Sequence, residues 1–326
     1  MTLAIIGSTG LVGTEIIKIL EKKKLKEIKK IIFVASKKSI GKKIKYNNKI
    51  NNIVSIEKAI EEKPKYALFS AGSQTALKYA KKFNKVGTTV IDNSSAFRMQ
   101  DNIKLIVPEI NGKKITKQDK IIANPNCSTI QLVMAVGGIE KKIGIRRLVV
   151  STYQSVLGTG QIAVQQLKSE QKGKAPKQKA YKKEIHLNAI PKCDDFTKNG
   201  YTKEEEKIIK ETNKILSSKI KITATAVRIP TLGGHGESVN FELKKETTLL
   251  ELEKIIKAQD GVEVDKKEKY TTPKEVREKD EVFVSRIRKD FSKKNTFNMW
   301  IVADPLRKGA ATNAVQILEN LINLNN

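Results

Sequence analysis

The chain begins with a short apolar segment, Leu3–Ile6, that leads directly into the run Gly7-Ser8-Thr9-Gly10-Leu11-Val12-Gly13. Apolar side chains then recur at helical spacing as far as Leu20. Three glycines spaced three residues apart, between a strand and a helix, are typical of the turn that binds a dinucleotide pyrophosphate. Gly7 permits the tight turn, Gly10 lets the backbone approach the anion, and Gly13 allows close helix–sheet packing. An ordinary turn is the alternative, but the strand and helix context favours a Rossmann-like fold.

Short apolar segments alternate with helical patterns through the first 125 residues. Continuous apolar strands separated by helices indicate a parallel sheet covered on both faces. Helices are expected from Leu11 and at Gln74–Phe83. The expected strands are Leu3–Ile6, Ile31–Ala35, Ala67–Ser70, Thr88–Ile91, Leu105–Val107 and Lys120–Ala123.

The pattern changes after residue 126, where longer segments alternate between apolar and polar residues. Such alternation is typical of antiparallel sheets. We therefore expect an α/β chain with a Rossmann-like doubly wound parallel sheet, followed by an α+β domain with a mixed, largely antiparallel sheet. The later strands are expected at Arg147–Tyr153, Ile220–Ile229, Ser238–Leu243, Val282–Arg288 and Thr296–Val302. The later helices are expected at Cys127–Glu140, Gly160–Ser169, Lys203–Ser217 and Lys308–Asn323, with a polar surface loop at Gln171–Lys183.

The chain of 326 residues carries 63 Lys and Arg against 35 Asp and Glu, a formal charge of +28. The lysines are scattered among glutamates and aromatic residues make up only 5% of the chain, so no specific nucleic-acid partner is predicted. Weak, salt-sensitive adsorption to polyanions is expected. Apolar runs are shorter than the ~18 residues that span a bilayer. Two cysteines suit a reducing compartment, so we expect a cytoplasmic protein without a membrane segment.

The residues after the second expected strand indicate which dinucleotide binds. In NAD sites an Asp or Glu at this place binds the ribose 2′-hydroxyl. This chain has Ser36-Lys37-Lys38-Ser39 instead. The hydroxyls of Ser36 and Ser39 and the ammonium of Lys38 suit a 2′-phosphate, so NADP(H) is favoured over NAD. No metal site is predicted.

Cys127 lies in Asn124-Pro125-Asn126-Cys127-Ser128-Thr129, between an apolar strand and an apolar helix. The first turn of a helix lowers the pKa of a thiol through its exposed N–H groups and positive dipole end. The polar neighbours argue against the alternative, a buried structural cysteine. Cys193 precedes Asp194 and Asp195, whose charges oppose thiolate formation. Cys127 is therefore the predicted nucleophile.

A thiolate needs a partner that handles protons, and the chain has two histidines. His186 lies in a segment of ordinary alternation and is expected to be packed or at the surface. His235 is framed by glycines in Gly233-Gly234-His235-Gly236-Glu237, a turn that can present a side chain to a cleft. A flexible hairpin is the alternative, but together with Cys127 we predict a general acid/base role for His235.

Several motifs extend this pattern along nearly the whole chain: Gly7–Gly13, Asp92–Arg98, Pro125–Thr129, Thr152–Val156, Asn199–Thr202, Glu211–Leu216, Val227–Pro230 and Leu306–Ala314. Together they resemble the aspartate-β-semialdehyde dehydrogenase family. The resemblance implies NADPH-dependent reductive dephosphorylation of β-aspartyl phosphate to aspartate semialdehyde through a cysteine thioester. It also implies a place in lysine, methionine and threonine biosynthesis.

The same resemblance implies roles for further residues. Gln154 would orient the substrate near Cys127, and Arg228 would bind the substrate α-carboxylate through its bidentate fork. Glu204 would hold the substrate amino group, and Asn126 would belong to the substrate site. The phosphate site would include Arg98 and Lys207. Gly158, Gly309 and Asn313 would lie near the cofactor.

The resemblance also implies the domain organisation. Residues 1–126, completed by a C-terminal helix at 306–326, would form the NADP-binding domain. Residues 127–305 would form a catalytic and dimerisation domain, in a homodimer or a dimer of dimers. Lys38 replaces a frequent Arg of the family, which softens the expected NADP selectivity. Pro305 and Gly236 replace a frequent Asn and Ser, which could alter local geometry.

Three alternatives remain at this point. N-acetyl-γ-glutamyl-phosphate reductase shares the acyl-phosphate chemistry, but its cysteine typically lies in a Gly-Cys-Tyr-Pro context. Glyceraldehyde-3-phosphate dehydrogenase has a Ser-Cys-Thr-Thr-Asn setting. A non-enzymatic protein built on a decayed dehydrogenase should have lost a required group, yet Cys127, Arg228, His235 and the glycines are all present.

Overall fold

A computed structural model describes residues 1–325 of the chain. The chain divides into two compact units. The first comprises Met1–Pro125 and the chain from Ala310 onward, and the second comprises Asn126–Gly309. From the sequence we expected the chain to pass from the first unit to the second after residue 126, and to return to the first unit before residue 306.

The first unit is built on a sheet with the strand order β3-β4-β2-β1-β5-β6-β8-β7. Its neighbouring strands run parallel, except that β3 and β4 form an antiparallel hairpin. The order reverses at β1, which has β2 on one side and β5 on the other. Ligands of open α/β sheets bind beyond the carboxyl ends of the strands at such a point. The strands are β1 (Thr2–Ile6), β2 (Lys30–Val34), β3 (Lys43–Tyr46), β4 (Lys49–Val54), β5 (Tyr66–Phe69), β6 (Thr89–Asp92), β7 (Lys104–Leu105) and β8 (Ile121–Ala123).

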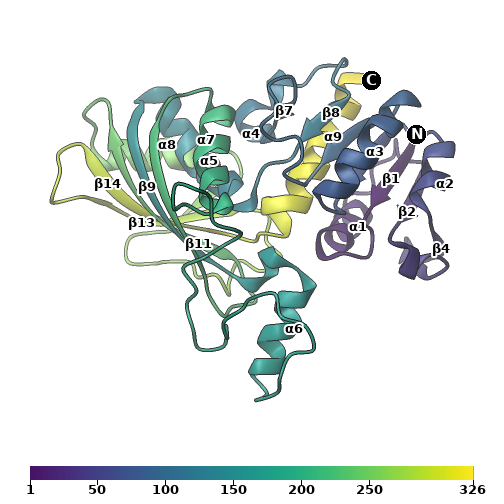
Figure 1. Ribbon diagram of the computed structural model, residues 1–326. Helices are drawn as coiled ribbons and strands as arrows, with labels where there is room; N and C mark the ends of the chain where they lie inside the picture. Colours follow the sequence, from purple (N-terminus) through teal and green to yellow (C-terminus); the bar gives the residue numbers. More distant parts are fainter. Residues whose placement is uncertain (326) are drawn as a thin grey trace. The chain divides into compact units, whose positions relative to one another are not determined.

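Helices cover both faces of this sheet. On one face, Leu3 and Ile5 of β1 pack in one core cluster with Ile16 of α1 and Leu318 of α9. On the other face, Phe69 meets Phe83 of α3 edge to face, with ring centroids 5.4 Å apart. The Rossmann-like doubly wound architecture is thereby confirmed. The helices are α1 (Leu11–Lys23), α2 (Ile56–Glu61), α3 (Ser73–Lys85), α4 (Pro108–Asn111) and α9 (Thr312–Asn325), the last drawn in yellow in Figure 1.

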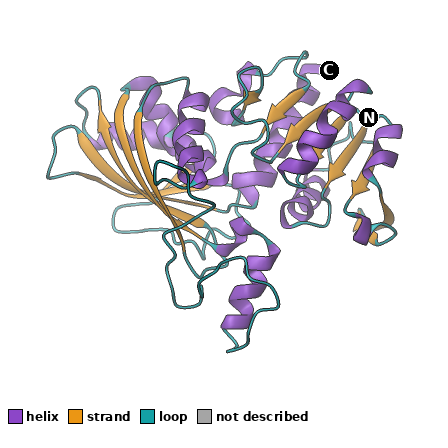
Figure 2. Ribbon diagram, viewed as in Figure 1, coloured by secondary structure: helices purple, strands orange, loops and turns teal. Residues whose placement is uncertain are grey.

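The second unit contains a sheet with the strand order β10-β9-β11-β14-β13-β12. Only the β9–β10 and β12–β13 pairs in this order are parallel, so the expected mixed, largely antiparallel sheet is confirmed. The helices α5, α7 and α8 pack on one face of it (Figure 2). Its strands are β9 (Ile145–Gln154), β10 (Lys221–Arg228), β11 (His235–Leu243), β12 (Val262–Val264), β13 (Val282–Lys289) and β14 (Thr296–Ala303). Its helices are α5 (Cys127–Lys142), α6 (Gln161–Glu170), α7 (Lys203–Leu216) and α8 (Leu249–Lys257).

The sequence pattern missed several short elements. The β3–β4 hairpin turns at Asn47 and Asn48, both with positive φ, but most residues of its strands are polar or exposed, so they gave no clear apolar signal. The elements α2, α4, α8 and β12 were also not expected. The C-terminal helix, expected from Lys308, begins at Thr312 after a π-helical turn at Arg307–Ala311. No helix within residues 1–325 is long and apolar enough to cross a membrane.

Candidate active site

Cys127 is the first residue of α5, so its thiol lies at the positive end of a helix of 16 residues. The side chain of Asn126 caps this helix, because its Oδ1 accepts the N–H groups of Ser128 and Thr129 at 3.0 and 3.2 Å. Cys127 is half-buried and forms no disulfide. A Cβ atom on Gly309 would lie 2.9 Å from Cβ of Cys127, so a side chain at position 309 would press on the cysteine.

Cys193 differs from Cys127 in its surroundings. It is buried, and burial raises the pKa of its thiol to about 12. Arg228 opposes this shift, whereas the carboxylates of Glu204, Glu205 and Asp194 add to it. Burial, more than the neighbouring carboxylates expected from the sequence, therefore disfavours the Cys193 thiolate, and the choice of Cys127 as the nucleophile stays a prediction.

Three of the predicted residues lie at one edge of the second unit's sheet. Gln154 ends β9 and Arg228 ends β10, and the parallel register pairs these two residues directly. His235 begins β11, which runs antiparallel to β9 with Gly236 opposite Tyr153. Strand direction and register therefore bring an amide, a guanidinium and an imidazole to the same edge.

The first turns of α5 contact this edge. Gln154 donates a hydrogen bond from Nε2 to Oγ of Ser128, the neighbour of Cys127, at 2.9 Å. One turn further along, Gln131 donates from Nε2 to the backbone carbonyl of His235 at 3.2 Å. The helix that carries the cysteine is thus fastened to the strands that carry the amide and the imidazole.

Glu204, in the first turn of α7, provides a buried negative charge. Its Oε1 accepts hydrogen bonds from Asn126 Nδ2 at 2.9 Å and from Gln154 Nε2 at 3.2 Å. Lys207 Nζ donates to its Oε2 at 3.2 Å. Burial alone would raise the pKa of Glu204, but Lys207, then Asn126, Arg228 and Gln154 together hold it below its usual value. Glu204 is therefore ionised at neutral pH and can attract a cationic group.

His235 is fully buried, and its ring is held from one side. The backbone N–H of Ser155 donates to Nδ1 at 3.1 Å, and Oγ of Ser155 lies 3.3 Å from the same atom. Burial lowers the pKa of His235 to about 3, with the positive charge of Arg228 as the second cause. The imidazole is therefore neutral over the physiological pH range.

Arg228 is also buried, and its Nη1 donates to the carbonyl of Ser155 at 2.7 Å. Gly158 packs closely against both this guanidinium and the imidazole. A Cβ atom on Gly158 would lie 2.7 Å from Nε2 of His235 and 3.3 Å from Nη1 of Arg228. A side chain at position 158 would collide with the imidazole and press on the guanidinium, so only glycine allows this close packing.

The two cations expected at the phosphate site belong to different units. Lys207 of the second unit forms ion pairs with Glu204 and with Asp194, the latter at 2.7 Å. Arg98 of the first unit is buried and donates from Nε to the carbonyl of Asn124 at 2.9 Å. Their convergence on one phosphate stays a prediction.

The glycine turn of the first unit fits a dinucleotide. A Cβ atom on Gly13 would lie 2.1 Å from the carbonyl oxygen of Gly7, so the turn can close against α1 only with glycine there. Gly10 occupies the N-cap position of α1 and offers no side chain to the first N–H groups, which stay suited to an anion. A cavity of about 280 Å³ beside the turn has among its lining residues Gly7, Ser36, Lys37, Ile40, Glu57 and Tyr79.

Two other predicted cofactor residues, Lys38 and Ser39, follow Lys37 in the short 3-10 turn at Lys37–Ser39. Asn313, expected near the nicotinamide, is buried in the first unit. Its Nδ2 donates to the carbonyl of Ile106 at 2.9 Å and to Oδ1 of Asn124 at 2.7 Å. This side chain therefore ties α9 to the loops at the carboxyl ends of the strands.

Sequence reasoning did not assign a role to Ser155 or Glu211. Oε2 of Glu211 accepts the backbone N–H of Asn126 at 2.7 Å, which fixes the residue before Cys127. Glu211 follows Glu204 by seven residues, a spacing that places both on one helix face and could have revealed it. The contact of Ser155 with His235 depends on strand register and leaves no local signal.

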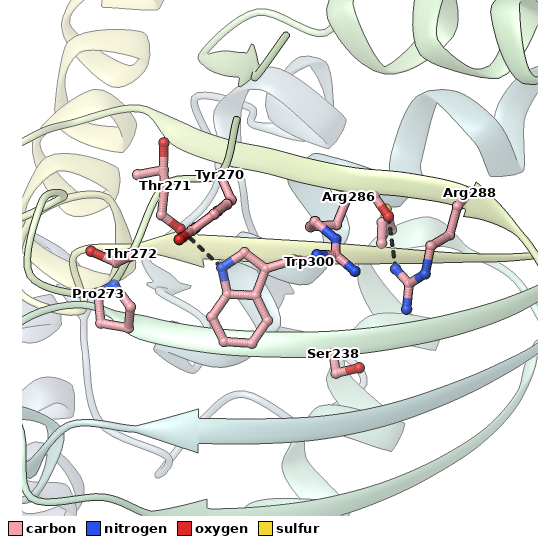
Figure 3. Close-up of a pocket in the computed structure, with 9 residues that line it drawn as sticks. Ser238, Tyr270, Thr271, Thr272, Pro273, Arg286, Arg288 and Trp300 are labelled. Carbon is pink, nitrogen blue, oxygen red and sulfur yellow. Dashed lines mark hydrogen bonds between the residues drawn. The ribbon is translucent and has the colours of Figure 1, made fainter. Parts of the chain in front are cut away.

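A second cavity, of about 290 Å³, lies on the face of the second unit's sheet opposite the helices (Figure 3). The indole ring of Trp300 lines this cavity, and its Nε1 donates a hydrogen bond to the carbonyl of Thr271 at 3.0 Å. The ring of Trp300 also contacts Tyr153, with centroids 5.7 Å apart. None of the predicted site residues lines this cavity. In the part of the chain that the structure describes, no group of three or more His, Cys, Asp or Glu side chains could hold a metal ion.

Comparison with known proteins agrees with this arrangement. Residues 2–118 match the family model described as "Semialdehyde dehydrogenase, NAD binding domain". Residues 136–308 match the model described as "Semialdehyde dehydrogenase, dimerisation domain". Fold and site thus define a two-domain semialdehyde dehydrogenase.

The individual relatives indicate which family of semialdehyde dehydrogenases the chain belongs to. The chain is 44% identical to aspartate-semialdehyde dehydrogenase of Aquifex aeolicus, over 98% of this chain and 97% of the relative. It is 40% identical to the Bacillus subtilis protein of the same name, over 99% and 97%. The crystal structure of aspartate semialdehyde dehydrogenase II from Vibrio cholerae superposes with a TM-score of 0.95 at 37% identity, covering 99% of this chain and 98% of that one. The chain belongs to the aspartate-semialdehyde dehydrogenase family.

Proposed function

We propose that the protein catalyses the NADPH-dependent reductive dephosphorylation of β-aspartyl phosphate to aspartate semialdehyde. The product is the common precursor in lysine, methionine and threonine biosynthesis. The reaction passes through a thioester on Cys127. The observation that carries the proposal is the position of this cysteine at the N-terminus of α5, fastened through Ser128 to the strand edge with Gln154, Arg228 and His235.

The charges around this edge suit an amino-acid substrate. Arg228 offers a buried guanidinium for the α-carboxylate, and Glu204 offers a buried carboxylate for the α-ammonium group. Asn126 and Gln154 hold Glu204 in place. A related structure, of aspartate semialdehyde dehydrogenase II from Vibrio cholerae, is described as complexed with ASA, and it is 37% identical to this chain. We propose that Arg98 and Lys207 bind the phosphate.

The bound dinucleotide supplies the hydride, and the first unit provides its site. Gly7–Gly13 suits the pyrophosphate, and the cavity bordered by Ser36 and Lys37 suits the adenosine half. We propose NADPH as the preferred form, with Ser36, Lys38 and Ser39 near the 2′-phosphate. Gly158, Gly309 and Asn313 are proposed to lie toward the nicotinamide.

We also propose a homodimer in the cytoplasm, which could assemble further into a dimer of dimers. The match of residues 136–308 to a dimerisation domain supports the dimer. The helix-free face of the second sheet, with Tyr153 and Trp300 in contact, is the proposed interface. A reducing compartment is consistent with a reactive thiol that must stay reduced.

The test is a coupled assay with β-aspartyl phosphate and NADPH, in which NADPH oxidation and phosphate release are followed together. One phosphate released for each NADPH oxidised supports the proposal. N-acetyl-γ-glutamyl phosphate serves as the competing substrate. A higher kcat/KM with that compound, or NADPH binding without turnover of either, would refute it.

A further inference from the structure

A third cavity, of about 680 Å³, opens in the first unit between β2 and β4. These two strands pair with each other at residues 33–34 of β2 and residues 53–54 of β4, near their carboxyl ends. Nearer their amino ends the strands separate, and residues 30–31 of β2 and Lys49 and Asn51 of β4 line the cavity. It therefore lies at the opposite end of the β2–β4 pair from the cavity beside the glycine turn.

Each of the two strands has an edge toward this cavity that is not paired with another strand. The amino-terminal part of β2 pairs with β1, and residues 49–52 of β4 pair with β3, so both segments have a strand on one side only. Such an edge presents main-chain N–H and C=O groups that can bind another molecule. The side chains of Asn47, Asn48 and Asn51 add amide groups to the lining. The cavity therefore has polar groups that can orient a ligand.

Part of the cavity wall is apolar. Four half-buried side chains line the cavity and pack against the core cluster of the first unit: Leu25, Ile28, Ile31 and Tyr46. The ring of Tyr46 lies against that of Phe33, with ring centroids 5.9 Å apart. Because these four side chains are only half-buried, a ligand with an apolar ring that covers them would remove apolar surface from water.

The charged groups around the cavity are of one sign. Among residues 1–325 no carboxylate lines it, whereas four lysines do: Lys24, Lys29, Lys30 and Lys49. Lys30 forms an ion pair with Glu62, but the other three form no ion pair within the described part of the chain. Glu21 of the neighbouring α1 is engaged by the hairpin turn, where its Oε1 accepts the backbone N–H of Asn47 at 2.6 Å. The three uncompensated ammonium groups therefore favour an anionic ligand.

We propose that this cavity is a second ligand site, which binds a small aromatic anion: a flat ring that carries a carboxylate, sulfonate or phosphate group. The ring packs on Ile31 and Tyr46, and the anionic group lies among Lys24, Lys29 and Lys49. An inorganic anion would leave the apolar wall in water, and an uncharged ring would leave the ammonium groups without a counter-charge. The cavity volume lies within the range of about 300–1,000 Å³ that is usual for small-molecule sites. This site does not depend on the proposed reaction.

Fluorescence titration with 8-anilinonaphthalene-1-sulfonate tests the site, because this aromatic sulfonate becomes fluorescent when it leaves water. The full chain is titrated at low ionic strength with excess NADP⁺, so that the probe does not occupy the dinucleotide site. We expect a saturable site that persists in NADP⁺ and weakens as salt is added. Displacement of all bound probe by NADP⁺, or the absence of saturable binding, would overturn the proposal.

Competition separates the two halves of the proposed ligand. Naphthalene-1-sulfonate should displace the probe at a concentration at least about tenfold lower than inorganic phosphate, because only the former can cover the apolar wall. Equal competition by the two anions would contradict the role of Ile31 and Tyr46.

Two double variants with the same net charge test the position of the site. Lys24→Glu/Lys49→Glu reverses two charges at the cavity, whereas Lys22→Glu/Lys45→Glu reverses two exposed charges on α1 and β3 that do not line it. We expect the Kd of the probe to rise about tenfold or more in the first variant and less than about twofold in the second, since exposed charges farther away are screened. An equal rise in both would show that only the total charge of the chain matters and would overturn the proposal.

Lysine acetylation, located by mass spectrometry, tests the position of the site in the native protein. At a probe concentration of about ten times Kd, acetylation of Lys24, Lys29 and Lys49 should slow about fivefold or more, because a bound anion shields these ammonium groups. Acetylation of Lys22 and Lys45 should keep its rate. Protection of all five lysines to the same extent, or of none, would place the probe elsewhere and refute the proposed site.

Discussion

Asn126 donates a hydrogen bond from Nδ2 to Oε1 of Glu204 over 2.9 Å, and so ties the N-cap of α5 to the first turn of α7. The same side chain uses its oxygen to cap the helix that begins with Cys127. One amide thus serves both the helix that positions the nucleophile and the carboxylate proposed to bind the substrate ammonium group.

Asn126→Ala should therefore impair both stability and catalysis. Loss of an N-cap costs about 1 kcal/mol of unfolding free energy, and loss of a hydrogen bond to a charged group costs about 1.5–3 kcal/mol. We expect the unfolding free energy measured in urea to fall by about 2.5–4 kcal/mol, together with a raised KM for the acyl phosphate. Thr248→Ala is the matched control, because Thr248 caps α8 through the N–H of Glu251. It should cost about 1 kcal/mol and leave KM unchanged; an equal rise in KM would contradict the role of Asn126.

Replacement of the two cysteines should have different effects on turnover. Cys127→Ala should abolish turnover and leave NADPH affinity nearly intact, because the glycine turn lies in the other unit. Cys193→Ala should keep turnover, since burial holds the pKa of that thiol at about 12. Steady-state assays and fluorescence titration with NADPH measure both effects. Turnover in Cys127→Ala near the native rate would end the thioester mechanism.

Much of this site followed from local sequence, because a glycine turn after a strand and a cysteine at a helix start are local signals. The contacts between segments did not. Glu211 meets the N–H of Asn126 across 85 positions of chain, and Ser155 meets His235 across 80. Such contacts depend on strand register and helix packing, which no single segment encodes. The β3–β4 hairpin was missed for a different reason, since most of its residues are polar or exposed and only a few, such as Ile53, reach the core.

Arg228→Lys should weaken substrate capture. A lysine retains the charge but lacks the planar fork that binds a carboxylate through two bonds, and it cannot reproduce the bond to the Ser155 carbonyl with the same geometry. We expect KM for β-aspartyl phosphate to rise about tenfold, the equivalent of about 1.4 kcal/mol. Arg146→Lys is the control, because Arg146 is exposed at the start of β9, at the opposite end of this strand from Gln154, and it should leave KM unchanged. An unaltered KM in Arg228→Lys would remove the carboxylate-binding role.

Glu237 and Glu204 should respond to pH with opposite signs. Burial raises the pKa of Glu237 well above its usual value, so the folded state holds this proton more tightly than the unfolded chain. That contribution is complete below pH 4.5 and is lost as the pH rises toward the folded-state pKa. The side chain at position 237 does not titrate in Glu237→Gln. The unfolding free energy of this variant, relative to that of the native protein, should therefore increase as the pH rises.

The pKa of Glu204 is lowered in the folded state, so its contribution is present above its unfolded pKa and is lost as the pH falls through the folded value. Glu204→Gln should be less stable than the native protein at neutral pH, and the difference should shrink in acid. Urea unfolding at several pH values between about 4 and 8.5 measures both trends. Differences that do not vary with pH in either variant would contradict these assignments.

The choice of cofactor should depend on Ser36. This residue and Lys37 line the cavity beside the glycine turn, where a ribose 2′-phosphate is proposed to bind. Ser36→Asp places a carboxylate there, which repels the phosphate of NADPH but can accept a hydrogen bond from the 2′-hydroxyl of NADH. We expect kcat/KM with NADPH to fall at least tenfold, about 1.4 kcal/mol, and the value with NADH to stay equal or rise. Lys38→Ala should lower kcat/KM with NADPH only, whereas Lys49→Ala in the exposed β4 strand should change neither. An equal fall in kcat/KM with NADPH and with NADH in Ser36→Asp would contradict this role, because it would show that the loop does not distinguish a 2′-phosphate from a 2′-hydroxyl.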